Sequence, residues 1–567
     1  MLLNRNLFRL GILVPVLIWI AVVYYYAVDV PWFDDFDPFP DFLRSWTDAK
    51  SFSEALGYLF QPNNEHRMVI GKLVTLFYYK LTGKLSIYFV LFSGVCFTLG
   101  TLGLFWSAFK KSNLSPYYFI PVAFLLFQVQ YHLVFLWAIC SMQHQAVVFF
   151  MTLSMLMLSR NKFWFAVVAA LLANYSMSNG IFVWAAGAGI LILQSSYKNL
   201  GIWLFTAVVA VTFYFIGMSP QGNESSVDFF LAHPELSVFG FFAFLGGLVD
   251  FFPEKEIVTR SVLPVLLGVA ASVWIAIWGF ANIRPWLTKT FGISFRKKGL
   301  LKVADETTPG EKSLQEFLIG ILLFLLANAL IIGFLRPRFG FFVMIVSNYK
   351  MYPALFLIVT YLSILLSVKA ATGKKIFRFG LIASVGIWAI SLVTYLPVIA
   401  ERSKYLMVNA YNQEHNAFGL GHIAFSKTAV YVDNLMKRMT SDGIYSFPQE
   451  ADWLVNEINS QNGEKLKEND VRYRVENNAI VVEDETSEYT LKRKGGQYAY
   501  LKQNAKIYLF KLAQNRYDGR NLFRQLDKGS IVEIPFSTLE KGEYELGVVR
   551  SINDAPVGQF LGKVTIP

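Results

Sequence analysis

The chain has 567 residues, of which 54% are hydrophobic and only 16% charged, and its mean hydropathy is +0.42. Soluble globular proteins carry about 25% charged residues, so this composition excludes an ordinary soluble protein and indicates a polytopic membrane protein. The formal net charge of +11 does not indicate nucleic-acid binding, because Lys and Arg gather in short loops between apolar segments. Two cysteines, Cys96 and Cys140, exclude a disulfide framework and a cysteine-rich metal site.

Apolar segments recur from the N-terminus to Pro397. The first, Leu7–Val28, is predicted to be an anchor, because no small-residue cleavage site follows it and many more apolar segments do. Met68–Leu81 is shorter and more polar, and is predicted to be a helix beside the membrane. With spans of roughly 20 residues, about eleven are predicted. After the first they are Leu85–Phe109, Tyr117–Ile139, Ala146–Leu158, Phe163–Met177, Ile181–Leu193, Ile202–Met218, Val262–Phe280, Phe317–Phe334, Tyr352–Val368 and Phe379–Pro397.

Positive charge predicts the topology of these spans. With the N-terminus inside, the inside loops contain Lys110-Lys111 and the basic segment Arg284–Lys302, whereas the outside turns near Cys140 and Ser178 contain no Lys or Arg. This distribution follows the positive-inside rule. It requires the interrupted segment Val227–Val258 to dip into the outer face without crossing.

The transmembrane domain is predicted to cover residues 1–399, and residues 400–567 to form a soluble domain outside the membrane. Ala424–Met439 and Pro448–Ser460 are expected to be helical. From Val471 onward apolar and polar residues alternate with period two, which predicts a small antiparallel β-sandwich. The predicted fold class is therefore a polytopic α-helical membrane protein with an α+β, β-sandwich-like extracytoplasmic domain.

The outer loop at residues 29–67 is the candidate catalytic segment, because charge beside apolar spans marks function. Asp34 and Asp35 are neighbours in it, and Pro38 and Pro40 are expected to keep this stretch extended or turned. Adjacent side chains in such backbone point to opposite sides, so one carboxylate can face a cavity while the other orients it. We favour Asp35 as a catalytic general base and Asp34 as the orienting carboxylate. The alternative is a solvated acidic loop.

The rest of this loop contains two further patterns. Ser51 and Glu54 have capping-box spacing at the start of an amphipathic helix predicted to lie in the outer interface. Glu65, His66 and Arg67 close the loop and are candidate substrate-binding residues. The alternative for them is charge that complements the dipole of the next helix.

A second outer cluster follows the span Phe317–Phe334. Pro337 is predicted to hold its neighbours Arg336 and Arg338 extended, so that both guanidinium groups project to one side. Paired guanidinium groups suit a phosphate, whereas the alternative is snorkelling to lipid headgroups. No HxxxH or CxxC pattern occurs, so no zinc site is expected, and dependence on a divalent metal is left open. The remaining candidate substrate-binding residues are Tyr349, Lys350 and His144.

Acids paired after the first span, many short spans and a C-terminal outer domain resemble the GT-C class of membrane glycosyltransferases. The chain looks most like bacterial members that use polyprenyl-phosphate sugars, including those that decorate O-antigen. The resemblance covers about residues 1–400 and rests on Asp34-Asp35, on Asn64–Arg67 and on Arg336–Tyr349 (RPRFGFFVMIVSNY).

This resemblance implies a location in the bacterial inner membrane, with the C-terminal domain in the periplasm. The implied donor is a polyprenyl-phosphate sugar such as an undecaprenyl-phosphate-linked one, and the acceptor is an extracytoplasmic glycan or a lipid-linked acceptor. Asp then serves as general base, and Arg stabilises the leaving phosphate. Membrane lipids are expected partners and nucleic acid is not. No cofactor is expected, and the absence of a Gly-rich nucleotide loop agrees with a lipid-linked donor.

Two other functional classes are considered. A lipid-linked glycan flippase would distribute charged residues along its spans, whereas here they gather at one outer mouth. A polysaccharide polymerase or ligase would share the charged outer loops but more usually carries a large loop between late spans. A non-enzymatic binding protein would have little use for so large a membrane domain.

Overall fold

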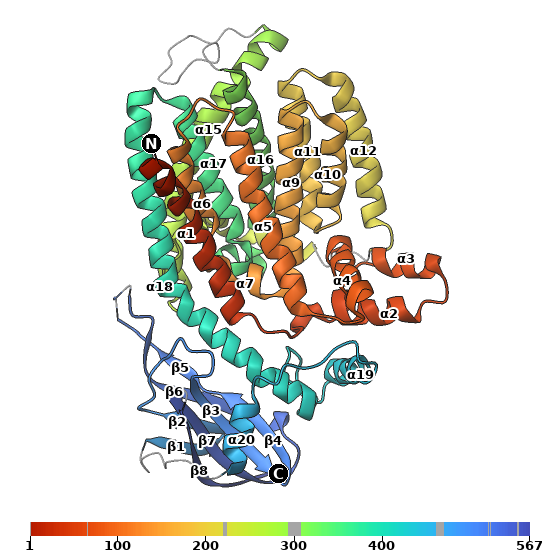
Figure 1. Ribbon diagram of the computed structural model, residues 1–567, viewed down its shortest axis with the longest axis vertical. Helices are drawn as coiled ribbons and strands as arrows, with labels where there is room; N and C mark the ends of the chain where they lie inside the picture. The colour runs from red at the N-terminus through yellow and green to blue at the C-terminus, as the bar shows by residue number, and fades with distance from the viewer. Residues whose placement is uncertain are drawn as a thin grey trace.

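The computed structural model describes residues 2–64, 66–218, 224–292, 308–460, 470–519, 521, 523–552 and 555–567. A helical bundle precedes a β-rich domain, and the long helix α18 (Ala370–Asn416) runs from one into the other (Figure 1). The other long bundle helices are α1 (Leu2–Tyr26), α5 (Ile87–Phe109), α9 (Ala146–Ser159), α10 (Phe163–Asn174), α11 (Phe182–Leu193), α12 (Tyr197–Phe215), α15 (Ile257–Phe291), α16 (Pro309–Leu335) and α17 (Met351–Ser367).

Among the described residues, nine helical segments are long and apolar enough to cross a membrane. Two shorter apolar helices, Phe163–Asn174 and Ser178–Leu193, coincide with two further predicted spans. The predicted span Tyr117–Ile139 is helical but broken, into α6 (Ile120–Leu126), α7 (His132–Leu136) and short 3-10 turns. These segments indicate a multi-pass membrane protein.

The outward face of α15 has the composition expected next to lipid. Val262, Leu266, Val273, Ile277 and Phe280 recur at helical spacing and are all exposed. A continuous exposed apolar stripe is unfavourable in water. The same stripe is favourable against acyl chains, since these are as apolar as the side chains.

The first loop lies at the bundle end nearer the β-rich domain (Figure 1). It contains α2 (Phe42–Asp48) and α3 (Phe52–Phe60), and α4 (Val69–Thr82) follows it. The predicted helix Met68–Leu81 is thereby confirmed as α4. The Ser51 hydroxyl accepts a hydrogen bond from the Glu54 amide at 3.2 Å, as the capping pattern predicted.

The chain between α12 and α15 contains a sharp bend. α13 (Glu224–Ala232) and α14 (Pro234–Gly246) belong to two apolar segments that meet at 99°. At the far side of the bend, Glu254 forms an ion pair with Arg516 of the β-rich domain at 2.9 Å. A bend of this kind is compatible with the predicted dip and equally with a broken span, so the dip stays a prediction.

The predicted domain boundary after residue 399 falls inside the continuous 47-residue helix α18, which runs from the bundle into the β-rich domain. The helix continues because its polar residues find partners in the β-rich domain. The Lys511 ammonium contacts the Glu401 carboxylate at 2.8 Å. The Asn412 side-chain amide donates a hydrogen bond to the Leu509 carbonyl and accepts one from the Leu509 N–H, on strand β4 (Lys506–Lys511). Asn412 thereby supplies hydrogen-bond partners to an edge strand, which would otherwise expose them.

The C-terminal domain is the predicted antiparallel β-sandwich. Its sheets have the strand orders β1-β2-β6-β5 and β4-β3-β7-β8. A buried ion pair between Arg550 on β7 and Asp484 on β2 joins the two sheets. The strands are β1 (Val471–Glu476), β2 (Ala479–Asp484), β3 (Gly496–Gln503), β4 (Lys506–Lys511), β5 (Ala513–Arg516), β6 (Leu526–Pro535), β7 (Gly542–Ile552) and β8 (Ala555–Ile566).

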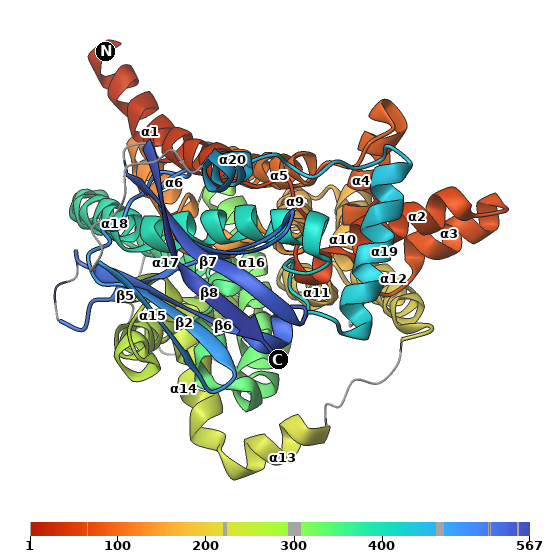
Figure 2. The same ribbon diagram turned by 90° about the horizontal axis from the view of Figure 1, so that it is seen from below.

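Two helices precede the sandwich, close to where they were predicted: α19 (Lys427–Ser441) and α20 (Asp452–Ser460). α19 lies against the first loop (Figure 2), and the Arg438 guanidinium donates two hydrogen bonds to the Asp48 carboxylate, at 2.6 and 2.9 Å. The C-terminal domain therefore contacts the acidic loop directly.

Topology can be tested with single cysteines introduced at exposed positions of a Cys96→Ser background, which leaves only the buried Cys140. We expect a membrane-impermeant maleimide to label Ser53→Cys and Ser537→Cys in intact spheroplasts. Lys162→Cys should react only after permeabilisation, because the positively charged loop that contains Lys162 is predicted to lie inside. Labelling of all three from the same side would contradict this topology.

Candidate functional site

A cavity of about 270 Å³ lies where the first loop meets the ends of the bundle helices. Five of the predicted site residues line it: Asp34, His66, His144, Arg336 and Tyr349. The first loop, two mid-chain turns and the segment between α16 and α17 all contribute to its wall. The other lining residues are Asn63, Asn64, Trp137, Ile139, Cys140, Gln143, Met177 and Asn348.

Of the two backbone geometries predicted for the acidic stretch, extended or turned, the structure has the turned one. Phe33–Asp35 forms a 3-10 turn and Asp37–Asp41 a π-helical turn. Pro38 stands in the first turn, where no intrahelical partner is lost by its missing N–H, so it starts a helix instead of breaking one. Phe33 has a φ of 53°, which an aromatic side chain rarely adopts and which tertiary contacts must hold in place.

The two aspartates have different environments, as expected. Asp34 and not Asp35 faces the cavity, however, which is the reverse of the assignment that we favoured from the sequence. Asp35 is 1% exposed, and its oxygens accept hydrogen bonds from the backbone N–H of Trp32 at 2.9 Å and of Ile139 at 2.7 Å. Its carboxylate therefore joins the first loop to the start of the short helix α8 (Ala138–Cys140). Asp34 is half-buried and lines the cavity.

Burial raises the pKa of both carboxyl groups above their ordinary values. For Asp35 the pKa rises to about 7, although the two backbone N–H groups and the nearby Arg402 cation act in the opposite direction. For Asp34 the pKa is raised by burial first and by the neighbouring Asp37 second. A carboxylate with a raised pKa is a stronger base, which suits proton abstraction.

The extended backbone predicted around Pro337 is wrong. Arg336 ends α16 in helical backbone, with φ −98° and ψ −17°, and Pro337–Phe339 forms a 3-10 turn. This turn directs Arg338 to the Ser225 hydroxyl on α13, whereas Arg336 lines the cavity. Burial first, and then the Arg336 charge, lower the pKa of His66 to about 4, so His66 is neutral near pH 7.

Arg67 and Lys350, which were expected to bind substrate, are engaged by the protein. The Arg67 guanidinium donates to the backbone carbonyls of Phe60, Tyr214 and Ile216, which joins the first loop to the end of α12. Glu65 lies outside the described residues.

Lys350 is 1% exposed, and its ammonium contacts the Asp250 carboxylate at 2.7 Å. The Arg260 guanidinium reaches the same carboxylate at 2.8 Å. Lys350 is therefore part of a buried ion cluster next to the cavity wall. The Asp250 carboxylate already neutralises the Lys350 charge, so Lys350 is poorly suited to bind a phosphate together with the two arginines.

The cavity wall contains buried polar atoms without a protein partner. Within the described residues, no hydrogen bond reaches Asn63 Oδ1, Asn348 Oδ1 or His66 Nδ1. A buried polar atom left unpaired costs about 1–3 kcal/mol. Asn63 and Asn348, which line the cavity, thus have hydrogen-bonding capacity that the protein does not use.

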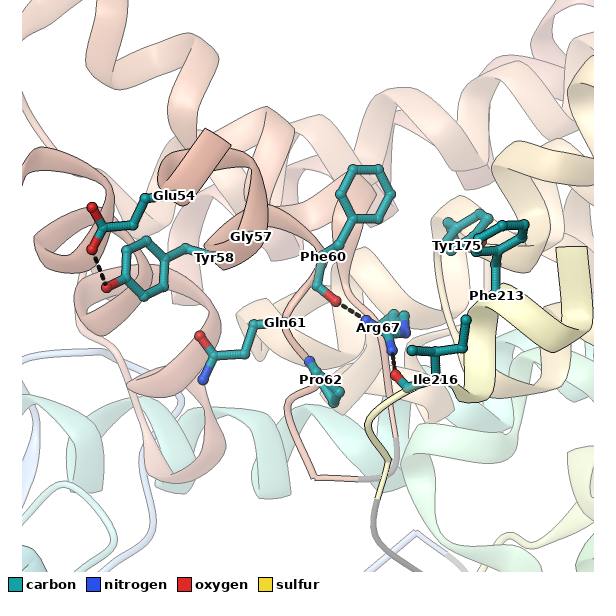
Figure 3. Close-up of a pocket in the computed structure, with 10 residues that line it drawn as sticks. All are labelled: Glu54, Gly57, Tyr58, Phe60, Gln61, Pro62, Arg67, Tyr175, Phe213 and Ile216. Carbon is teal, nitrogen blue, oxygen red and sulfur yellow. Dashed lines mark hydrogen bonds between the residues drawn. The ribbon is translucent and has the colours of Figure 1, made fainter. Parts of the chain in front are cut away.

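The structure also contains an apolar groove of about 760 Å³, whose lining residues are drawn in Figure 3. Gln61, Pro62 and Arg67 line the groove, whereas Asn63 and His66 line the cavity. Residues 61–64 and 66–67 therefore form a wall shared by the two. The rest of the groove is lined by Glu54, Gly57, Tyr58, Phe60, Tyr175, Phe213 and Ile216.

Sequence reasoning missed several residues around the site. Asn328 was detectable as a polar side chain inside an apolar span, which often marks function. Its amide accepts a hydrogen bond from Asn179, which in turn bonds Tyr352, the partner of His144. Asn63 and Asn348 carry no such signal, because polar residues are ordinary in loops.

Comparison of the chain with protein-family models, with curated proteins and with solved structures finds no match. Among the described residues, no group of three or more His, Cys, Asp or Glu side chains is arranged to hold a metal ion. The function is therefore argued from the geometry and chemistry of the cavity.

The two aspartates should differ sharply when replaced. Asp35→Ala leaves two buried N–H groups without an acceptor, and each should lower the free energy of unfolding by about 1–3 kcal/mol. Asp34→Ala removes no hydrogen bond of this kind and should change stability by no more than about 0.5 kcal/mol. Thermal unfolding of both purified variants in the same detergent measures the difference. Equal losses of stability would contradict the structural role of Asp35.

Proposed function

We propose that this protein is a membrane glycosyltransferase of the GT-C type, which moves a sugar from a polyprenyl-phosphate donor to an extracytoplasmic acceptor. The observation that carries the proposal is that Asp34 and Arg336, from loops far apart in the sequence, line one cavity. A carboxylate and a guanidinium in one small cavity supply a base and an anion-binding group for the same reaction.

Asp34 acts as the general base in this proposal. It takes the proton from the attacking acceptor hydroxyl as the new bond forms between that oxygen and the anomeric carbon of the sugar. The raised pKa of Asp34 increases its basicity, so the proton transfer is easier than to an ordinary surface carboxylate. Asp35 holds the first loop in position through its two backbone bonds.

Arg336 binds the leaving group. When the bond between the anomeric carbon and the phosphate oxygen breaks, negative charge grows on the polyprenyl phosphate. A guanidinium that faces this oxygen stabilises the charge and presents forked donors to phosphate. His66 lies beside Arg336 and is neutral near pH 7, so it adds no competing charge.

The remaining features match the two parts of such a donor. The cavity volume equals that of roughly nine water molecules at about 30 Å³ each, which accommodates a single sugar but no longer glycan. The unpaired oxygens of Asn63 and Asn348 suit sugar hydroxyls. The apolar groove on the other side of this shared wall suits the lipid chain, because burial of each CH₂ contributes about 0.8 kcal/mol.

The activity can be tested by incubating the purified protein with a panel of radiolabelled undecaprenyl-phosphate sugars and an extract of envelope glycans. We expect consumption of one donor, with release of undecaprenyl phosphate. Asp34→Asn should slow transfer by about 10²–10⁴-fold, the usual cost of losing a general base. The rate of the unmodified protein should rise with pH through the raised pKa of Asp34, since only the carboxylate accepts a proton.

The matched control for the phosphate site is the neighbouring arginine. Arg336→Gln removes a charge-assisted contact of about 1.5–3 kcal/mol, which weakens donor use by roughly ten- to a hundredfold. Arg338→Gln should leave donor use nearly unchanged, because that side chain turns to Ser225. Transfer that survives Asp34→Asn, or equal effects of the two arginine variants, would contradict the proposed roles.

A further inference from the structure

A chain of buried and partly buried hydrogen bonds leads from the backbone of α16 to the cavity. Asn328 Nδ2 donates to the Phe324 carbonyl at 2.8 Å, and Asn328 Oδ1 accepts from Asn179 Nδ2 at 2.7 Å. The same Asn179 nitrogen donates to the Tyr352 hydroxyl at 2.6 Å. The Tyr352 hydroxyl lies 2.8 Å from His144 Nδ1. Three helical segments and the π-helical turn Ser141–Gln145 are thereby connected.

The first link determines the direction of all the others. A backbone carbonyl can only accept, so Asn328 must direct its NH₂ group to Phe324 and its oxygen to Asn179. Asn179 must then direct its NH₂ group to Asn328, and the same group reaches Tyr352. The Tyr352 oxygen therefore accepts a hydrogen bond, and its one proton is available for His144 Nδ1.

The opposite arrangement leaves a buried proton unpaired. If His144 Nδ1 carried the hydrogen, the Tyr352 hydroxyl would accept twice and its own proton would need another acceptor. Tyr352 is 1% exposed, and the structure shows no other acceptor for its hydroxyl among the described residues. An unpaired buried donor is costly, so the ring accepts at Nδ1 and carries its proton on Nε2.

We propose that this relay holds His144 as a neutral imidazole whose Nε2–H donates into the cavity, to an oxygen atom of the bound ligand. His144 lines the cavity, and its Nδ1 is engaged by Tyr352, so Nε2 is its polar atom on the ligand side. The structure thus assigns to His144 the role of a specificity-determining donor. For the identity of the ligand, this inference rests on the proposed function.

The acceptor oxygen belongs either to a sugar hydroxyl or to the donor phosphate. Both present lone pairs to an N–H group, and the cavity contains partners for both: Asn63 and Asn348 for hydroxyls and Arg336 for phosphate. A neutral imidazole adds no charge to that of Arg336. It therefore contributes direction, and hence selectivity, more than electrostatic attraction.

The tautomer can be tested without any assay of transfer. In protein labelled with ¹⁵N in its six histidine rings and placed in lipid bilayers, solid-state NMR distinguishes the protonated ring nitrogen from the unprotonated one. The His144 signals are identified by their loss in His144→Gln. We expect Nε2–H alone in the unmodified protein, and an Nδ1–H fraction in Tyr352→Phe, which lacks the donor to Nδ1. A dominant Nδ1–H tautomer in the unmodified protein would overturn the proposal.

The contact with ligand can be tested by comparing two replacements of His144. Gln keeps an N–H donor near the position of Nε2, whereas Leu has none. We expect His144→Leu to raise the KM for the donor by about tenfold with little change in kcat, and His144→Gln to restore most of the loss. His415→Gln, at an exposed position on α18, is the control and should leave KM unchanged.

Undecaprenyl phosphate, used as a competitive inhibitor, separates the two oxygen sources. If His144 donates to the phosphate, His144→Leu weakens this inhibition as much as it raises KM. If it donates to a sugar hydroxyl, inhibition is unchanged while KM rises. Correctly folded His144→Leu protein with unchanged KM and unchanged inhibition would overturn the ligand contact. A protein that consumes no donor would contradict the proposed function, and the NMR result would still decide the tautomer.

Discussion

The pair of hydrogen bonds that Asp35 accepts from the backbone amides of Trp32 and Ile139 positions the rest of the site. These bonds hold the strained turn at Phe33, and the turn directs Asp34 into the cavity. Each bond is strong because the Asp35 carboxylate is buried, so water does not compete with the two N–H groups for its oxygens. Burial also disfavours the charged form, which accounts for the raised pKa of Asp35. The orientation of Asp34 toward the cavity thus depends on the burial of its neighbour Asp35.

The same principle organises the opposite wall of the cavity. The segment before α17 is anchored by Lys350, whose ammonium is shared between the Asp250 carboxylate and the Tyr395 hydroxyl. In an apolar bundle such an ion cluster is tolerated only when every charge has partners, and removal of one partner is then strongly destabilising. The cluster therefore fixes the backbone that presents Asn348 and Tyr349. Charged residues close to the site are thus of two kinds. Some line the cavity, and others are buried and hold the backbone around it in place.

The C-terminal domain supports the first loop from the other side. The Phe33 amide donates to the Leu420 carbonyl at 2.9 Å, and the Phe33 ring stacks on His422 with centroids 6.2 Å apart. On α18, the Arg402 guanidinium lies 4.7 Å from the centre of the Trp32 ring. Contacts of this kind explain why the chain maintains a single long helix between its two domains. The helix leads to α19, which lies against the acidic loop (Figure 2).

The sequence by itself determined the apolar spans and the antiparallel sandwich, because hydrophobic length and period are read directly from the order of the residues. It also brought Asp34, His144 and Arg336 forward as candidates. Which aspartate faces the cavity was decided only by the tertiary structure, since the two are chemically alike and their difference lies in a distant amide, that of Ile139. Backbone geometry around Pro38 and Pro337, and the partners of Arg67 and Lys350, likewise depend on elements remote in the chain. A buried charge takes whichever partner the fold supplies, and local sequence does not encode that partner.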